Sequence, residues 1–535
     1  MHLEYKWQAT LIVALGLFMA VLDNTVVNVA LPQIKSFYHI ANYSDVIWVS
    51  TAYFLAQAAV IPAVGYISDI VGTKNVFIAA LALFTLGSAL CIFAPSLPAL
   101  IIFRVFQGIG GGALFPIVFA IVFRIFPPAE RGQASAVVSI PVLLAPAFGP
   151  TIGGYLTTVF DWHAIFAINV PIGIGVLALA YYRLNGLAAE RAAMGNARGL
   201  PVPTRRNFDF GGLLLVMSGV TTLVYGISEA GSLGWSDRKV VTYMIVGAAL
   251  LATFTYVELK VAKDPVIDLR LFTTYSFTLG ILVTGIVGAF FFGGVLLFPI
   301  FFQNALGYSP LNSGEIFILQ GLMAGVGVAV SGRLYNLIGP RPLAATGLAL
   351  VAFSTIGLLH MDAHTTGWSI QGWMLIRGFG FGMINTPAQT LTLSTVNNRD
   401  MARASSLVNV MRQIFSAVGI ATITTYLAQQ TASHAQAIGT TIQQQFAHRP
   451  PQGVAAQCIA SVGKQGQAAI QACAGHYVGQ NALIAGINDA FGFVLIGFCV
   501  GIGLALVMGR DKNAQGMKSG QAAPSSEVRP AMAAE

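Results

Sequence analysis

A carboxylate interrupts the first apolar segment of this chain. Residues 22–33 read LDNTVVNVALPQ, which places Asp23, Asn24 and Asn28 where hydrocarbon side chains would otherwise continue. A carboxylate whose surroundings alternate between burial and contact with a cation can bind and release a proton. These residue types therefore predict a proton-binding group at Asp23. The alternative is that Asp23 caps a broken helix next to Asn24, Asn28 and Pro32.

A fixed positive charge lies inside another apolar segment. Arg104 stands in IIFRVFQGIGGGALFP, and a guanidinium keeps its proton and is expensive to place in lipid. It must face a partner or a cavity, and Asp23 is the obvious partner, with Gln107 on the same helical face as Arg104. The alternative is a structural arginine that bonds backbone carbonyls. Four more polar residues of the apolar segments are candidates to line a cavity: Glu315, Arg377, Asn409 and Arg412.

The elements that must position these side chains are membrane helices. Of the 535 residues, 56% are hydrophobic and only 9% are charged, whereas soluble domains carry roughly 25% charged residues. A bilayer core needs about 20 apolar residues per helix, and runs of this length lack the alternation of a membrane barrel. The sequence predicts an all-α membrane protein with fourteen such helices, at residues 8–31, 45–66, 75–95, 98–124, 132–158, 162–184, 209–230, 239–261, 275–303, 312–335, 341–361, 370–395, 402–429 and 485–508.

Basic residues between these segments predict the orientation. With the N-terminus in the cytoplasm, 20 of the 28 Lys and Arg residues fall on the cytoplasmic side and five on the opposite side. Positive charge concentrates on the cytoplasmic side of membrane proteins, so we expect both termini there. The net charge of +8 is thus explained by topology, and nucleic acid is not expected as a partner.

Three long polar stretches separate or follow the helices. Residues 185–208 are expected to form a basic cytoplasmic linker, residues 430–484 an outward loop with some helix, and residues 511–535 a disordered cytoplasmic tail. Cys458 and Cys473 lie in the outward loop. They can pair only if that loop faces an oxidising compartment.

The two halves of the chain are related by an internal repeat. GYISDIVGTK and GRLYNLIGPR share one pattern 267 residues apart, and Arg104 matches Arg377 at an offset of 273 residues. Parallel repeats of this kind are common in transporters. We therefore expect a six-helix bundle in residues 1–184, a second in residues 262–510, and two inserted helices in residues 209–261. The paired motif positions are Gly65 with Gly332, Asp69 with Asn336, Gly72 with Gly339, and Lys74 with Arg341.

Two of the motifs suggest conformational roles. The repeated motif joins two helices by a tight turn, and we interpret it as a latch that holds one conformation, although it could be a turn alone. The fifth predicted helix contains APAFGPTIGGYL, in which prolines kink the helix and glycines let a neighbour approach. Helix packing alone is the other interpretation of this segment. Its motif residues are Pro146, Gly149, Pro150, Gly153 and Gly154.

Together these motifs resemble the fourteen-helix drug:proton antiporters of the major facilitator superfamily, the EmrB/QacA type. LDNTVVNVALPQI, GYISDIVGTK, RVFQGIGGG, GPTIGGYL, FAINVPIGI, DPVIDLRLF and ARASSLVNVMRQIFSAVGIA follow one another in the order of that family. The resemblance implies two six-helix bundles around a central cavity, and export of hydrophobic, often cationic compounds against inward proton flow. It also implies a bacterial inner-membrane location and, from the long outward loop, a periplasmic adaptor and an outer-membrane channel as partners.

Carried over to this chain, the resemblance assigns roles to the motif residues. Asp23 and Arg104 become the proton-coupling pair, Asp69 and Lys74 part of the cytoplasmic gate, and the glycines and prolines of the fifth helix the antiporter motif. The chain departs from the family pattern at Ala145, at His163 and Ala164, and at Glu315. An acid at Glu315 makes a preference for cations more plausible.

Other functions are weaker interpretations of this sequence. It contains no HExxH, no G-x-S-x-G and no G-x4-G-K-[ST], which are signatures of metalloproteases, serine hydrolases and nucleotide-driven pumps. Energy is therefore expected from a proton gradient, with no cofactor. An exporter of one physiological solute, such as a siderophore, fatty acid or metabolite, stays open as an alternative, and a membrane enzyme or receptor is less favoured.

Overall fold

The computed structural model of the chain is all-helical in the part that it describes. The described residues are 4–40, 43–127, 130–184, 209–262, 266–267, 269–394, 396, 401–447, 454, 458 and 467–507, and no strand occurs among them. The linker at 185–208 and the tail at 511–535 lie outside the described residues.

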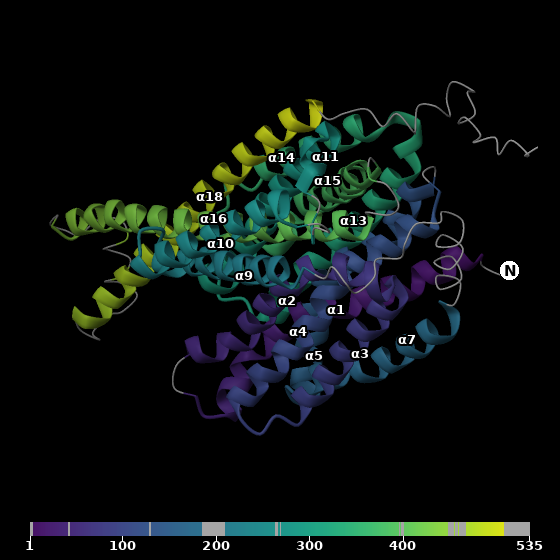
Figure 1. The fold of residues 1–535 in the computed structure, drawn as a ribbon. Coiled ribbons are helices and arrows are strands. Elements are labelled where there is room, and N and C mark those ends of the chain that lie inside the picture. The colour runs from purple at the N-terminus through teal and green to yellow at the C-terminus, as the bar shows by residue number, and fades with distance from the viewer. Residues whose placement is uncertain are drawn as a thin grey trace, which may run out of the picture.

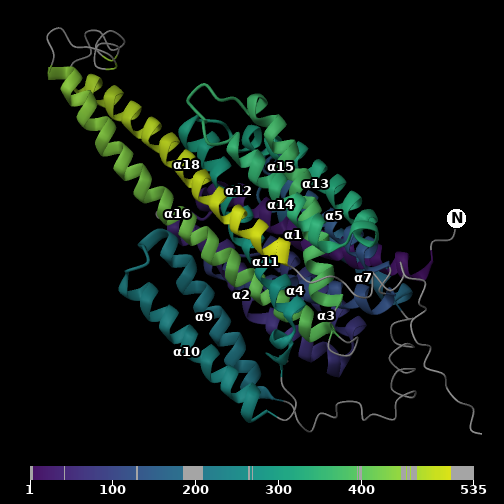
Figure 2. The same cartoon turned by 90° about the horizontal axis from the view of Figure 1, so that it is seen from above.

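Helices of the N-terminal half and of the inserted pair follow the predicted segments closely. The N-terminal half consists of α1 (Tyr5–Phe37), α2 (Tyr43–Val71), α3 (Thr73–Ile92), α4 (Leu97–Ile125), α5 (Arg131–Val159), α6 (Ala164–Ala167) and α7 (Asn169–Arg183). The inserted pair is α9 (Phe210–Leu233) and α10 (Arg238–Lys260). In Figure 2 this pair lies at one side of the molecule, and α9 packs against α2 and α16.

The C-terminal half has the same order of helices, with one irregular member. It begins with the short 3₁₀ helix η3 (Leu269–Thr273) and continues with α11 (Tyr275–Val287), η4 (Gly288–Phe292), α12 (Gly293–Pro299) and η5 (Ile300–Ala305), in which η4 and η5 are π-helical. The remaining helices are α13 (Pro310–Ile338), α14 (Pro340–Ile356), α15 (Gly367–Ser394), α16 (Met401–Ala447) and α18 (Gln467–Val507). Figure 1 shows both halves side by side.

Eleven helices in the described part of the chain are long and apolar enough to cross a membrane. The sequence predicts fourteen. The remaining three predicted segments also form helices, namely α5, α14 and α15, but they are not among the eleven. α14 has only 17 residues, and α15 carries Arg377 together with several threonines and glutamines.

Each half has its own apolar core. One cluster of buried hydrophobic residues comes mainly from α1 to α7, and a second comes from α11 to α18. The motif glycines repeat in conformation as well as in sequence: Gly72 has a φ of 100° and Gly339 a φ of 85°. Both values lie in the left-handed region that glycine adopts without steric cost, so the two glycines make the same turn in both halves.

The two halves contact each other near one end of the helices. Ser405 of α16 donates a hydrogen bond to the Pro116 carbonyl oxygen of α4 over 2.9 Å. Thr390 of α15 and Ser135 of α5 are bonded over 3.4 Å. All four residues lie at helix ends that the basic residues of the sequence predict to be cytoplasmic.

The outward loop of the sequence prediction is largely helical. α16 continues to Ala447 and α18 begins at Gln467, so most of residues 430–484 extend the two helices. Figures 1 and 2 show these extensions projecting beyond the bundles, at the end opposite the N-terminus. A disulfide joins Cys458 to Cys473. Polar residues such as glutamine and alanine-rich stretches suit a helix that leaves the bilayer, which is why low hydropathy here did not mean a loop.

Candidate functional site

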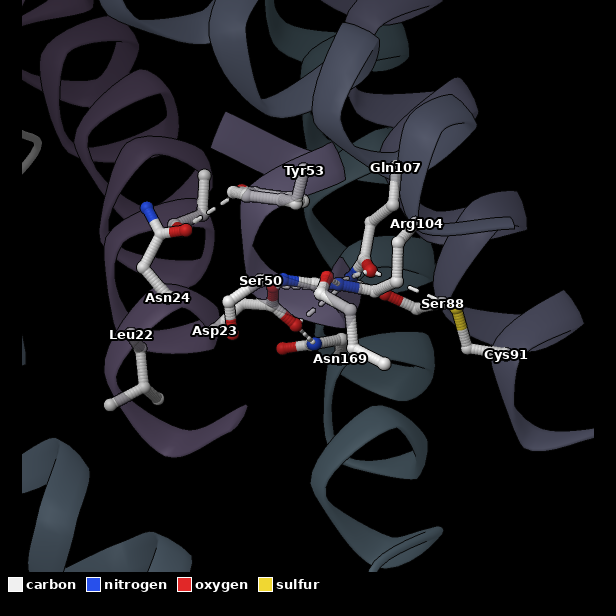
Figure 3. Close-up of polar contacts among 12 residues, drawn as sticks. Leu22, Asp23, Asn24, Ser50, Tyr53, Ser88, Cys91, Arg104, Gln107 and Asn169 are labelled. Atoms are coloured by element: carbon white, nitrogen blue, oxygen red, sulfur yellow. Dashed lines mark hydrogen bonds and ion pairs between the residues drawn. The ribbon is translucent and has the colours of Figure 1, made fainter. Parts of the chain in front are cut away.

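Asp23 is fully buried in the middle of α1. Its exposed fraction is 1%, and its neighbours along the helix are aliphatic. A buried carboxylate needs partners that compensate its charge. Figure 3 shows that the side chains around it come from four other helices.

Arg104 of α4 supplies the compensating charge. Its Nη1 lies 2.6 Å from Oδ2 of Asp23, and its exposed fraction is 1%. Nε donates a second hydrogen bond to the carbonyl oxygen of Val49 in α2 over 3.1 Å. The guanidinium also lies over the ring of Tyr53, 4.0 Å from its centroid, where a cation–π contact adds to the stabilisation. The ion pair thus ties α1, α2 and α4 together.

Amide side chains complete the surroundings of the carboxylate. Gln107 Nε2 donates to Oδ1 of Asp23 over 2.9 Å and to the hydroxyl of Ser88 over 2.6 Å. Asn169 of α7 donates to the same Oδ1 over 2.8 Å. Gln107 Oε1 accepts from Arg104 Nη1 over 2.6 Å. Both oxygens of Asp23 are therefore occupied by N–H donors.

This geometry determines what the site can do chemically. A proton on Asp23 would point at an N–H donor, since each carboxylate oxygen already accepts a hydrogen bond. Proton binding therefore requires the carboxylate and at least one donor to separate. Because Arg104 keeps its own proton, the exchangeable proton of the pair belongs to Asp23.

Three residues of this site escaped the sequence interpretation: Ser88, Tyr53 and Asn169. Asn169 lies within FAINVPIGI, which the resemblance quoted without giving the asparagine a role. An uncharged polar residue in an apolar helix was the available signal, because such groups need a hydrogen-bond partner in lipid. Conversely, Asn24 and Asn28 do not join the network (Figure 3). Asn28 is exposed and bonds Ser50 and the carbonyl of Asn24.

The glycine motif of α5 packs on the helix turn that follows Asp23. A Cβ atom built on Gly149 would collide with Thr25, and one built on Gly153 would lie 3.1 Å from the Val26 carbonyl oxygen. These glycines let α5 approach α1 closely. Gly154 continues the motif, with its carbonyl accepting from Thr158 over 2.7 Å. The side chains of Pro146 and Pro150 lie outside what the structure describes.

The first copy of the repeated motif contributes to the contact between the halves. A Cβ atom on Gly65 of α2 would lie 2.7 Å from Cα of Arg403 and 2.8 Å from the carbonyl oxygen of Ala402, both in α16. Lys74 donates to the Tyr181 carbonyl over 3.0 Å. The side chain of Asp69 is outside the described part of the structure.

The second copy of the motif lies against α5. A Cβ atom on Gly332 would lie 2.9 Å from Cβ of Ala136. Gly339 forms the turn into α14, which Arg341 follows. The structure does not describe the side chain of Asn336.

The other predicted cavity residues are dispersed over the C-terminal half. Arg377 is completely buried and donates to the hydroxyl of Thr355 over 2.9 Å. Arg412 donates to Oδ1 of Asn409 over 2.7 Å. Glu315 is exposed near the start of α13, so its side chain does not face either arginine-containing region.

A buried, proton-exchanging ion pair inside one of two repeated helical bundles is the architecture of a membrane transporter. The chain belongs to the Major Facilitator Superfamily, whose family profile matches residues 13–420. Members of this superfamily are transporters and not enzymes. Its eleven apolar helices make the protein a multi-pass membrane protein.

Several characterised relatives are multidrug exporters by name. The chain is 34% identical to the multidrug resistance protein B homolog of Mycobacterium tuberculosis (strain ATCC 25618 / H37Rv), over 79% of this chain and 76% of that protein. It is 31% identical to the fatty acid resistance protein FarB of Neisseria gonorrhoeae, over 83% and 87%. It is 29% identical to the multidrug export protein EmrB of Escherichia coli (strain K12), over 79% and 81%.

Solved structures share the fold at low sequence identity. The human organic anion transporter MFSD10 (TETRAN) superposes with a TM-score of 0.59 at 15% identity, covering 92% of this chain and 99% of that one. This similarity concerns the fold alone.

Proposed function

We propose that this protein exports hydrophobic toxic compounds from the bacterial cytoplasm in exchange for protons. The observation that carries the proposal is the pair of Asp23 and Arg104, joined over 2.6 Å in a fully buried site. A buried ion pair adds little net stability, so a role in proton exchange explains its presence better than folding does.

The coupling follows from the competition for Asp23. In the arrangement described above, Arg104, Gln107 and Asn169 occupy the carboxylate. A proton arriving from the outside replaces these contacts, and α1 then loses its attachment to α4 and α7. Because α5 packs directly on α1 through Gly149 and Gly153, a displacement of α1 is passed to the helix that contacts the C-terminal half.

Alternating access is the motion that this coupling would drive. We propose that α5, α14 and α15 also span the bilayer, which gives fourteen membrane helices with both termini in the cytoplasm of a bacterial inner membrane. The contacts between the halves, including Ser405 with Pro116, then lie on the cytoplasmic side. The form described here is accordingly closed toward the cytoplasm.

The names of the relatives support hydrophobic toxic compounds as cargo. Multidrug resistance and fatty acid resistance proteins are both among them. The sequence suggested a preference for cations because of Glu315, and the exposure of that residue weakens the suggestion. Export of a single physiological solute, such as a fatty acid, is the second candidate, favoured by the buried arginines of the C-terminal half.

We also propose that the helical extensions of α16 and α18 contact a periplasmic adaptor that leads to an outer-membrane channel. The extensions project beyond the bundles (Figure 2), and the disulfide between Cys458 and Cys473 suits an oxidising compartment.

The proposed function is tested with purified protein in liposomes that enclose a pH-sensitive dye. Chemically unlike hydrophobic compounds, among them the lipophilic cation ethidium, are added to wild type, to Asp23→Asn, and to Asp362→Asn as a matched control at an exposed loop residue. We expect compound-dependent proton movement in wild type and in the control, and none in Asp23→Asn although it folds and inserts. Proton movement that persists in Asp23→Asn would refute the assignment of the proton site. Movement with one compound class alone would favour the narrow exporter.

A further inference from the structure

A second buried arginine lies in the C-terminal half without an acid partner. Arg377 of α15 has an exposed fraction of 0%, and its Nη1 donates to the hydroxyl of Thr355 over 2.9 Å. Its Nε and Nη2 are both buried and have no hydrogen-bond partner, and no ion pair involves Arg377 in the part of the chain described. An uncompensated guanidinium in this position is strongly unfavourable, so the site is chemically incomplete.

The internal repeat shows which group is missing. Arg104 of the first half corresponds to Arg377, and Ser88, which belongs to the Arg104 network, corresponds to Thr355 at an offset of 267 residues. The position matching Asp23 falls within this range of offsets at Gly294, where a built Cβ atom would lie 2.8 Å from Nη2 of Arg377. A glycine therefore stands where the first half carries the carboxylate.

The unpartnered nitrogens of Arg377 have the geometry of an anion receptor. Nε and Nη2 lie on the same edge of the guanidinium, where their N–H bonds run parallel and match the two oxygens of a carboxylate or phosphate. Around them, the ring centroids of Phe291, Phe298 and Phe498 lie 5.1 Å, 5.8 Å and 5.7 Å from Cζ. These rings stabilise a cation in part, but they offer no hydrogen-bond acceptor, and they provide apolar surface for a hydrocarbon chain.

The helix beside Arg377 is irregular at this point. Phe291 belongs to η4, and Gly294 follows η4 directly in α12. π-helical segments are rare and occur frequently at functional sites. η4 also contacts Arg412, since a Cβ atom on Gly288 would lie 3.6 Å from Cγ of that arginine. The guanidinium of Arg412 lies 5.4 Å from the ring of Phe115 in the N-terminal half, so η4 links Arg377 to the interface between the halves.

We propose that Arg377 binds the anionic head group of an amphiphilic molecule, a carboxylate or a phosphate, whose hydrocarbon chain lies against Phe291, Phe298 and Phe498. The head group takes the place that Asp23 occupies beside Arg104, and Gly294 leaves the room for it. That the bound amphiphile is cargo rests on the proposed export function, whereas the binding itself does not.

The test compares three ligands that have the same twelve-carbon chain and different heads: dodecanoate, dodecanol and dodecyltrimethylammonium. Binding is measured below their micellar concentrations, with the full-length protein in phosphatidylcholine nanodiscs and with empty nanodiscs subtracted. Two variants remove the site in opposite ways. Arg377→Gln removes the charge, and Gly294→Asp supplies a carboxylate from the protein itself. Arg333→Gln, at an exposed arginine of α13, is the matched control.

We expect dodecanoate to bind wild type and Arg333→Gln more tightly than the other two ligands do. Each site variant should weaken dodecanoate binding by roughly tenfold to a hundredfold, as for hydrogen bonds to charged groups, and leave dodecanol binding unchanged. Without ligand, Arg377→Gln should melt at a higher temperature than wild type, because the uncompensated charge is gone. A purely structural arginine would give the opposite change in melting temperature, which keeps the test decisive if Gly294→Asp does not fold.

Equal dodecanoate binding by wild type and Arg377→Gln would overturn the proposal. Adding phosphatidylglycerol to the nanodiscs separates two sources of the anion. Competition that depends on Arg377 supports the site and assigns it to a lipid phosphate, and no competition supports it for a carboxylate. Arg377-dependent binding without coupled proton movement in liposomes would refute the export function and leave this site standing.

Discussion

Replacing Gly65 with alanine is expected to open the contact between α2 and α16. The added Cβ would lie 2.7 Å from Cα of Arg403 and 2.8 Å from the carbonyl oxygen of Ala402. Both are backbone atoms, so no side-chain rotation can relieve the overlap. The two helices must move apart, and with them the two halves of the protein.

The size of the effect follows from these distances. Ordinary contacts begin at 3.4 Å, so a separation of about 0.7 Å is needed at Arg403. Overpacking of this kind costs about 1–3 kcal/mol, which corresponds to roughly a 5- to 150-fold shift of a two-state equilibrium. The shift disfavours the form described here, in which the halves meet at the end that we assign to the cytoplasm.

The assay follows a single reporter cysteine at that interface. Ser135→Cys is introduced with Cys499→Ser, because residue 135 is fully buried between α5 and α15 while Cys499 is exposed. Its rate of reaction with a small thiol reagent should rise 5- to 150-fold in Gly65→Ala. Gly175→Ala is the matched control, since nothing lies within 4 Å of a Cβ atom at that helical glycine. Equal labelling rates in the two alanine variants would show that the close approach at Gly65 does not hold the halves together.

Three further outcomes are expected. Arg104→Lys should abolish compound-dependent proton movement in liposomes, because an ammonium can lose its proton and lacks the planar fork that bonds Asp23 and Val49 together; wild-type coupling would contradict this. Asn169→Leu should lower the coupled transport rate roughly tenfold to a hundredfold through the loss of one hydrogen bond to a charged group, whereas an unchanged rate would remove Asn169 from the site. Mass spectrometry of unreduced protein should find the peptides of Cys458 and Cys473 linked, and two free thiols at these positions would exclude the disulfide.

The helical architecture could be predicted from the sequence where composition alone decides. Long apolar runs must be helical in lipid because every backbone group needs an internal partner, and the described helices fall on the predicted segments. The ends of α16 and α18 could not be predicted in this way. Outside the bilayer, hydropathy no longer distinguishes helix from loop, and residues 430–447 and 467–484 continue as helix because their composition favours it.

The candidate site was predictable to the extent that charges demand partners. One buried acid and one buried arginine in the same bundle had to be paired, and Asp23 and Arg104 are. Asn169 and Ser88 were not predictable, since neutral polar groups in membrane helices have many possible partners, including backbone carbonyls. The same reasoning about charge did not reveal that Arg377 has no acid beside it, because that depends on the side-chain arrangement around Gly294.

The length of α16 has a mechanical consequence. With 47 residues, the helix is about 70 Å long at about 1.5 Å per residue, more than twice the roughly 30 Å thickness of a bilayer core. Its first turns, at Ala402 and Arg403, press on Gly65, and its last turns belong to the projecting extension. A tilt of about 5° around the first turns would swing the far end by roughly 6 Å over that length. α16 therefore acts as a lever arm that reports the closure of one membrane face to any molecule that grips the other.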